Sequence, residues 1–144
     1  AIPKILGNSS YMDNVRMRTE IYKQRALEAK EIFGSTPGIK FIEPKGAFYM
    51  TVLFEDGVLR DNQTLPVAND KVRERIEKLC TARFSHDKRF VYYLLGATGI
   101  ITVPLTSFYS KINGIRLTLL EANDKVRRDT FIKIRDKMAE YIQS

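Results

Sequence analysis

Mostly apolar side chains recur at gaps of four and three residues through the early part of the chain. The positions are Val15, Thr19, Tyr22, Ala26, Ala29 and Phe33. This spacing places the six side chains along one face of an α-helix. Gly34 and Pro37 follow, and proline cannot continue a helix. We therefore predict a helix of about six turns over residues 13–34, preceded by irregular chain at residues 1–12.

Short runs of β-branched and aromatic residues predict four strands further along the chain. The runs cover residues 39–43, 47–54, 99–105 and 115–120. Residues 47–54 are apolar at successive positions, so we expect this strand to be buried on both faces. The polar segment between the third and fourth strands is predicted to be a loop.

Helical periodicity returns in three places between and after these strands. An amphipathic helix is expected at Asn69–Cys80, and a short one around Phe90–Leu95 runs into Gly96. A closing helix carries apolar positions from Val126 to Tyr141. Strands interspersed with helices predict an α+β fold, also described as an α/β two-layer sandwich. We expect a small mixed or antiparallel sheet of about four strands packed against helices.

Composition is that of a globular domain. The chain has 144 residues, of which 44% are hydrophobic and 28% charged, so it can bury a core and is not expected to be disordered. No apolar run approaches the ~20 residues that cross a bilayer, and the first residues do not resemble a signal peptide. The single cysteine, Cys80, excludes an internal disulfide and favours a reducing, cytoplasmic setting.

The net charge of +7 raises the question of nucleic-acid binding. Basic residues are interleaved with acidic ones, for example in NDKVRERIEKLC, and this pattern is typical of solvated helix faces. The pattern disfavours a nucleic-acid role. A basic α+β module that binds nucleic acid or an acidic protein nevertheless remains the alternative function, and a pseudo-enzyme or interaction domain without cofactor is a third.

Arg116 stands inside the fourth predicted strand. Ile115, Leu117 and Leu119 alternate as a buried face, so the guanidinium belongs to the opposite face. One interpretation is an arginine at a sheet edge, paired with a nearby acid such as Glu121. The other is a planar, permanently charged fork that binds both oxygens of a carboxylate.

Three motifs in order give this arginine a context. They are Gly46-Ala47-Phe48-Tyr49, the segment from Gly99 to Pro104 followed by Phe108, and Gly114-Ile115-Arg116-Leu117. With the closing helix, they resemble the small C-terminal domain of a fold-type-I, class I/II aminotransferase, which depends on pyridoxal phosphate. IRLTLLE is most similar to the alanine and aspartate branches. The family usually has glycine after the proline, where this chain has Leu105, which leaves specificity open.

The resemblance covers nearly the whole chain and implies its organisation. Residues 1–12 would lead in from a large domain that precedes them, residues 13–34 would be the connector helix, and residues 35–144 would be the small domain. The intact protein would be a homodimer. Its large domain would supply the catalytic lysine and the cofactor ligands, so this chain alone would be an inactive fragment without bound cofactor.

The resemblance also implies an activity. The intact enzyme would move an amino group between an amino acid and a 2-oxo acid by means of pyridoxal phosphate. Arg116 would bind the α-carboxylate of either substrate, and Phe108 would form a wall of the pocket. No catalytic, cofactor-binding or metal-binding residue is expected within these residues, and the identity of the amino acid is left open.

Three other side chains, Lys111, His86 and Cys80, have groups that could take part in chemistry. Lys111 follows a serine, as a cofactor lysine does, but it comes too late in the chain, and we expect a solvated loop residue. His86 is the only histidine and is expected at a surface or helix-capping position. Cys80 ends an amphipathic helix and is expected to be a core or half-buried thiol, while Phe48 and Tyr49 are expected to be core aromatics.

Overall fold

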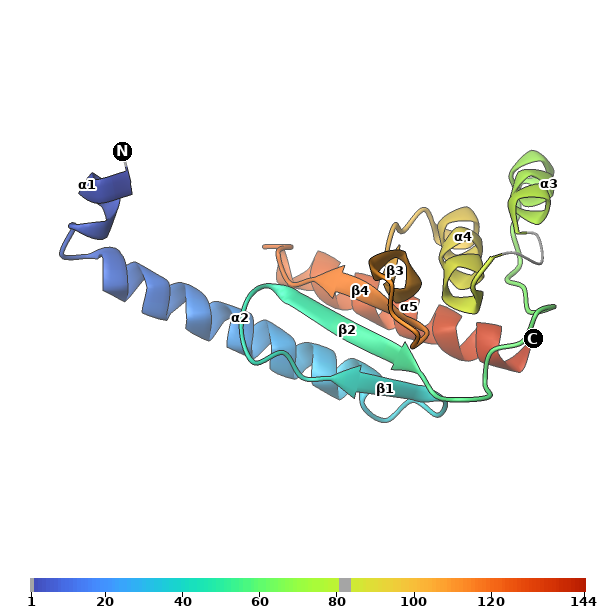
Figure 1. Cartoon of the computed structure of the whole chain (residues 1–144), viewed down its shortest axis with the longest axis horizontal. Coiled ribbons are helices and arrows are strands. Elements are labelled where there is room, and N and C mark those ends of the chain that lie inside the picture. Colours follow the sequence, from blue (N-terminus) through green and yellow to red (C-terminus); the bar gives the residue numbers. More distant parts are fainter. Residues whose placement is uncertain (1, 81–83) are drawn as a thin grey trace.

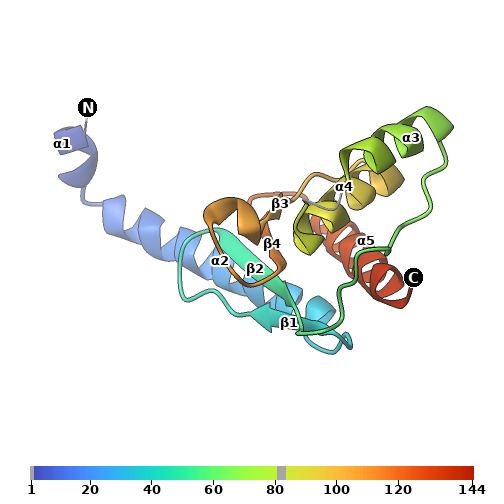
Figure 2. The same ribbon diagram turned by 45° about the vertical axis from the view of Figure 1, so that its right-hand side comes forward.

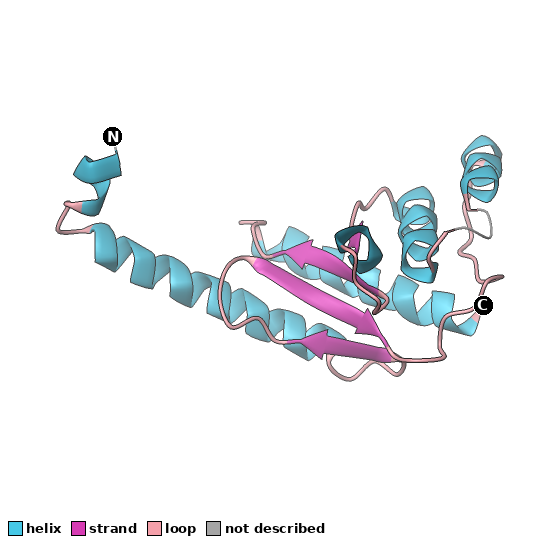
Figure 3. Cartoon of the chain, viewed as in Figure 1, coloured by secondary structure: helices cyan, strands magenta, loops and turns pink. Residues whose placement is uncertain are grey.

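The computed structural model describes residues 2–80 and 84–144. It has two layers, a four-stranded antiparallel sheet and a set of helices that cover one of its faces (Figure 1). The sheet lies in front and helices α2 and α5 lie behind it in the views of Figures 1 and 3. The predicted α+β class is confirmed, with a sheet that is antiparallel throughout.

The strands are β1 (Ile39–Ile42), β2 (Tyr49–Phe54), β3 (Val103–Pro104) and β4 (Gly114–Thr118), in the spatial order β1-β2-β4-β3. The third strand was predicted over residues 99–105, and this prediction is wrong in extent. Pro104 has no backbone N–H to continue a ladder. The chain turns instead into a 3₁₀ helix, η1 (Leu105–Phe108), where a loop was expected.

The helices are α1 (Ile2–Leu6), α2 (Tyr11–Phe33), α3 (Asp70–Leu79), α4 (His86–Thr98) and α5 (Asp124–Gln143). Helix α1 corrects the prediction that residues 1–12 are irregular. Its Pro3 lies in the first turn, where the missing N–H would have no helical partner in any case. Helix α1 buries no side chain, so the pattern of apolar positions could not reveal it.

Helix α4 extends beyond its expected end. It passes through Gly96, at which an added Cβ would lie 2.3 Å from Cδ1 of Ile76 on α3. Gly96 therefore serves the close approach of α4 to α3 and does not break the helix. Gly99, with φ of 76°, provides the left-handed cap instead.

Two helices begin with the same hexapeptide, ANDKVR, at residues 68–73 and 122–127. In both, the asparagine caps the helix, because its side-chain oxygen accepts a hydrogen bond from the N–H three residues later. The distances are 3.1 Å for Asn69 and 3.0 Å for Asn123. Identical local sequence thus produces identical local structure.

The core lies on one face of the sheet only. Met50, Val52 and Phe54 of β2 are buried, whereas Tyr49 is 39% exposed and the intervening side chains are partly buried. The expectation that this strand is buried on both faces is therefore wrong. Helices α2 and α5 lie behind the sheet, whereas the face that carries Tyr49 and Arg116, called here the open face, has only the short η1 in front of it (Figure 3).

The first half of α2 extends away from the sheet, as both views show (Figures 1 and 2). Its buried side chains begin only at Ala26 and continue to Phe33 at its end. Of the stripe that predicted the helix, Val15 and Thr19 are exposed and Tyr22 is partly buried, so the stripe is covered chiefly along its second half.

Candidate functional site

Arg116 lies at the middle of β4 on the open face. The register places Arg116 opposite Thr51 on one side and Val103 on the other, with Tyr49 at the diagonal position of β2. The guanidinium carbon lies 4.0 Å from the centre of the Tyr49 ring and 4.4 Å from that of Phe108. Arg116 therefore contacts two aromatic rings that come from two different elements, β2 and η1.

Glu121, the acid that could have paired with Arg116 at a sheet edge, is engaged elsewhere. The Glu121 carboxylate accepts a hydrogen bond from the N–H of Asn123 at 2.8 Å. The Glu121 carbonyl oxygen accepts one from Arg127 at 3.0 Å. Among residues 2–80 and 84–144, no carboxylate forms an ion pair with Arg116, and no acceptor takes a hydrogen bond from its guanidinium.

Contact with two rings limits the movement of the guanidinium. In such cation–π contacts an aromatic ring is attracted to the flat face of a guanidinium, whereas the N–H groups donate hydrogen bonds in the plane. An anion with two oxygens can then approach along the edge and accept parallel hydrogen bonds. The arrangement suits the planar recognition of a carboxylate.

Phe108 owes its position to a short loop that begins at η1. Tyr109, at the end of η1, is fully exposed and has φ of 60°, so the chain reverses sharply directly after Phe108. The backbone N–H of Thr106 and that of Gly114 both donate to Oδ2 of Asp87, at 3.0 and 3.4 Å. Asp87 is completely buried, and sequence reasoning missed it because an acid at the start of a helix usually faces solvent.

Tyr49 was also missed as a contact of Arg116. It was expected in the core, as was Phe108 in part, yet the two rings are 39% and 48% exposed. Alternation along β2 separates Tyr49 from the buried Met50 and could have indicated the open face. The pairing of β2 with β4, which brings Tyr49 beside Arg116, is a long-range property that alternation does not contain.

A cavity of about 260 Å³ opens at the edge of β4 next to the short β3. Arg116, Thr102 and the α5 residue Thr130 are among the residues that line it. The hydroxyl of Thr102 is buried without a hydrogen-bond partner among the described residues, which fits a site for a water molecule. Pockets for small ligands usually measure about 300–1,000 Å³, so this cavity encloses no complete binding site.

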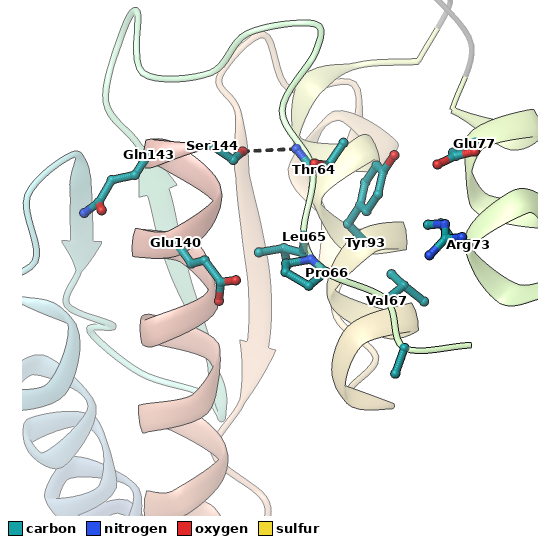
Figure 4. Close-up of a pocket in the computed structure, with 11 residues that line it drawn as sticks. Thr64, Leu65, Pro66, Val67, Arg73, Glu77, Tyr93, Glu140, Gln143 and Ser144 are labelled. Carbon is teal, nitrogen blue, oxygen red and sulfur yellow. Dashed lines mark hydrogen bonds between the residues drawn. The ribbon is translucent and has the colours of Figure 1, made fainter. Parts of the chain in front are cut away.

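A second hollow, of about 640 Å³, lies at the other end of the helical layer (Figure 4). Arg73 of α3, Tyr93 of α4 and Glu140 of α5 point toward it from three helices. Arg73 is paired with Asp70 at 2.6 Å, and Glu140 with Lys137 at 2.6 Å. The charges of Arg73 and Glu140 are thus satisfied within their own helices, so neither side chain offers an unpaired charge to the hollow.

The remaining candidates lie apart from this chemistry. Lys111 is exposed on the loop before β4, as expected for a solvated loop residue. His86 is the first residue of α4, 37% exposed in its side chain, with Nε2 2.9 Å from Oδ1 of Asp61, and it occupies the expected helix-terminal surface position. Cys80 is buried at the end of α3, and burial raises the pKa of its thiol, which lowers its reactivity.

The described part of the chain offers neither a metal-binding cluster nor a membrane-spanning helix. No cluster of three or more histidine, cysteine, aspartate or glutamate side chains there could hold a metal ion. No described helix combines the length and the apolar character needed to cross a membrane.

Comparisons with known proteins place this geometry in a family context. No protein-family model matches the sequence. Over 144 residues, the chain is 39% identical to an uncharacterized aminotransferase of Methanocaldococcus jannaschii, of which it spans 33%. An aminotransferase of Escherichia coli with a solved structure matches 84% of the chain and 23% of its own length, with a TM-score of 0.53 and 18% identity, and so shares the fold. The resemblance to aminotransferases is therefore confirmed: the chain is homologous to one third of such a protein.

Proposed function

We propose that this chain is the small, substrate-side domain of an aminotransferase that depends on pyridoxal phosphate, and that Arg116 binds the α-carboxylate of its substrates. The amino acid and the 2-oxo acid of a transamination share this carboxylate. One fixed cation therefore serves both halves of the reaction and orients each substrate in the same way.

The observation that carries the proposal is the unpaired guanidinium. Arg116 is partly buried in a sheet, where a cation is expected to acquire an acidic partner. Its guanidinium carbon instead lies 4.0 Å from the ring centre of Tyr49 and 4.4 Å from that of Phe108, and its hydrogen-bond donors find no acceptor among the described residues. A carboxylate from a substrate would complete this coordination.

Two described residues with chemistry that could serve the cofactor, Lys111 and Asp87, do not fit it. Lys111 is exposed on a loop and not enclosed in a pocket. The buried acid Asp87 already accepts hydrogen bonds from its own chain on both oxygens, so it cannot pair with a pyridine nitrogen. We therefore assign the cofactor-binding groups to a large domain of a longer protein, and the role of this chain is to bind and orient the substrate.

The test is the Arg116→Lys variant in the full-length protein. A single ammonium cannot replace two parallel hydrogen bonds to a carboxylate. We expect KM to rise strongly and kcat/KM to fall by about 10- to 100-fold, which corresponds to the loss of a charged hydrogen bond. Arg73→Lys on the exposed start of α3 is the matched control and should leave both constants unchanged. Near-native kinetics for Arg116→Lys would remove Arg116 from substrate binding.

A further inference from the structure

Asp87 accepts an unusual number of hydrogen bonds for a buried carboxylate without a cation. Oδ1 accepts from the hydroxyl groups of Ser85 at 2.8 Å and Thr106 at 2.6 Å. Oδ2 accepts from the backbone N–H groups of Thr106 at 3.0 Å and Gly114 at 3.4 Å. Asp87 has no ion-pair partner in the described ranges, so these four donors alone compensate its burial.

The positions of these donors relate Asp87 to Arg116. Thr106 lies two residues before Phe108 in η1, and Gly114 lies two residues before Arg116 in β4. A single carboxylate thus joins the two ends of the segment 106–114. The Phe108 ring centre and the Arg116 guanidinium carbon lie 4.4 Å apart, and each residue follows one of these two ends by two positions.

The lack of a side chain at Gly114 permits this bridge. A Cβ at Gly114 would lie 2.6 Å from the carbonyl oxygen of Val52 and 2.9 Å from a methyl group of Leu105. Only a residue without a side chain allows β4 to begin so close to β2 and η1, where its N–H reaches the buried carboxylate. Leu105, at the position where the family usually has glycine, packs against Gly114, at the start of β4.

We propose that Asp87 is a positioning residue for the carboxylate-binding arginine: it ties η1 to the start of β4 and so fixes the Phe108 ring over the Arg116 guanidinium. The consequence for substrate binding rests on the proposed function, whereas the bridge itself can be tested without any substrate. With the ring in place, the guanidinium loses its rotational freedom before a ligand arrives, and less entropy is lost on binding.

The experiment measures the Nε–H resonance of Arg116 by NMR on the 144-residue chain. Aromatic rings stacked on a guanidinium displace this resonance by their ring currents, and Phe108→Leu gives the displacement that is due to one ring. We expect Asp87→Ala to move the resonance to the position found in Phe108→Leu. In the double variant the two effects should not add, because both remove the same ring from the same place.

Two variants separate positioning from general stability. Asp87→Asn can still accept from both backbone N–H groups with its carbonyl oxygen and donate to the two hydroxyl oxygens, so it should restore the native resonance. Ser85→Ala removes a hydrogen bond to the same carboxylate but lies outside the segment 106–114, and should also leave the resonance in place.

A native resonance in a folded Asp87→Ala variant, or additive shifts in the double variant, would overturn the inference. Should Asp87→Ala not fold, Thr106→Ala takes its place, since it removes a hydroxyl donor and keeps the N–H. A partial displacement is then expected, and none would again overturn the inference. None of these readouts involves a substrate, so Arg116→Lys with native kinetics would contradict the proposed function and leave the bridge standing.

Discussion

Two arginines, one on each side of the sheet layer, meet opposite conditions. Arg127 of α5 is only 6% exposed in its side chain and is saturated by its own chain, with Glu28 at 2.8 Å, Asp124 at 2.9 Å and the Glu121 carbonyl at 3.0 Å. Arg116 on the open face contacts two rings and no described acceptor. The first arginine is used to join α5 to α2, and the second remains available to a ligand.

The same division extends to the aromatic residues. Phe90 of α4 is completely buried and contacts Phe54 and Tyr141 with ring centres 5.2 Å away in each case. Phe108 is nearly half exposed and contacts a cation. Residue type alone therefore does not indicate role in this chain. What distinguishes Arg116 and Phe108 from Arg127 and Phe90 is that the rest of the described chain leaves the first pair partly exposed and buries the second.

The largest effect that this comparison predicts concerns the two phenylalanines. Phe90→Ala should lower the free energy of unfolding by about 3–5 kcal/mol, because it leaves a cavity among buried rings. Phe108→Ala should lower it by less than about 1 kcal/mol, since it loses chiefly a cation–π contact near the surface. Urea unfolding followed by circular dichroism measures both. Comparable losses would mean that Phe108 is a core residue and that the open face is not distinct.

Replacing Arg127 or Arg116 should give a smaller difference in unfolding free energy than replacing the two phenylalanines. Arg127→Ala is expected to cost about 2–3 kcal/mol of unfolding free energy, because it leaves the mostly buried Glu28 with only a longer contact to Arg128 at 3.6 Å. Arg116→Ala should cost less than about 1 kcal/mol. Arg73→Ala, at the same place in the first ANDKVR sequence, is the control and should lie within about 0.5 kcal/mol of the native protein. A loss for Arg116→Ala as large as that for Arg127→Ala would assign Arg116 a structural role.

The smallest predicted effect on stability concerns Tyr141 and arises only in alkaline solution. Burial raises the pKa of the Tyr141 hydroxyl above its ordinary value near 10, although the charge of Arg89 opposes the shift. The unfolded chain ionises this tyrosine at lower pH than the folded chain does. The stabilisation is thus complete below pH 10 and is lost as pH rises toward the folded pKa, at up to about 1.4 kcal/mol per pH unit.

Tyr141→Phe should flatten this decline. At neutral pH the variant should be as stable as the native chain or slightly more so, because the buried hydroxyl has no hydrogen-bond partner in the described structure. Tyr93 and Cys80, whose pKa values burial also raises, account for the slope that remains. Tyr109→Phe, at a fully exposed position, is the control. Identical alkaline unfolding curves for Tyr141→Phe and the native chain would contradict the assignment.

Local patterns in the sequence were sufficient for most of the elements. The stripe ending at Phe33 predicted α2, and the alternation around Ile115 predicted the buried face of β4. Helix α1 and η1 were missed because neither buries a side chain, so neither leaves a periodic trace.

Long-range contacts set the limit of what could be predicted for the site. Arg116 was identified from its place in a strand, and Phe108 was predicted as a pocket wall only by family resemblance, without its contact to Arg116. Tyr49 and Asp87 could not be assigned, because their roles depend on which strand pairs with β2 and on where η1 folds. The two ANDKVR segments show the same limit: Arg73 is largely solvated and Arg127 is buried, although their local sequences are identical.

The first half of α2 extends away from the sheet, so amide hydrogen exchange should differ between the two halves of this one continuous helix. From Tyr11 to Ile21 the backbone hydrogen bonds are supported by little besides the helix itself, and short unsupported helices open readily in water. From Ala26 to Phe33 the helical hydrogen bonds can open only when α2 separates from the core that its side chains enter. Amide protons in the first half should therefore exchange with solvent through fraying, and those in the second half only through global unfolding.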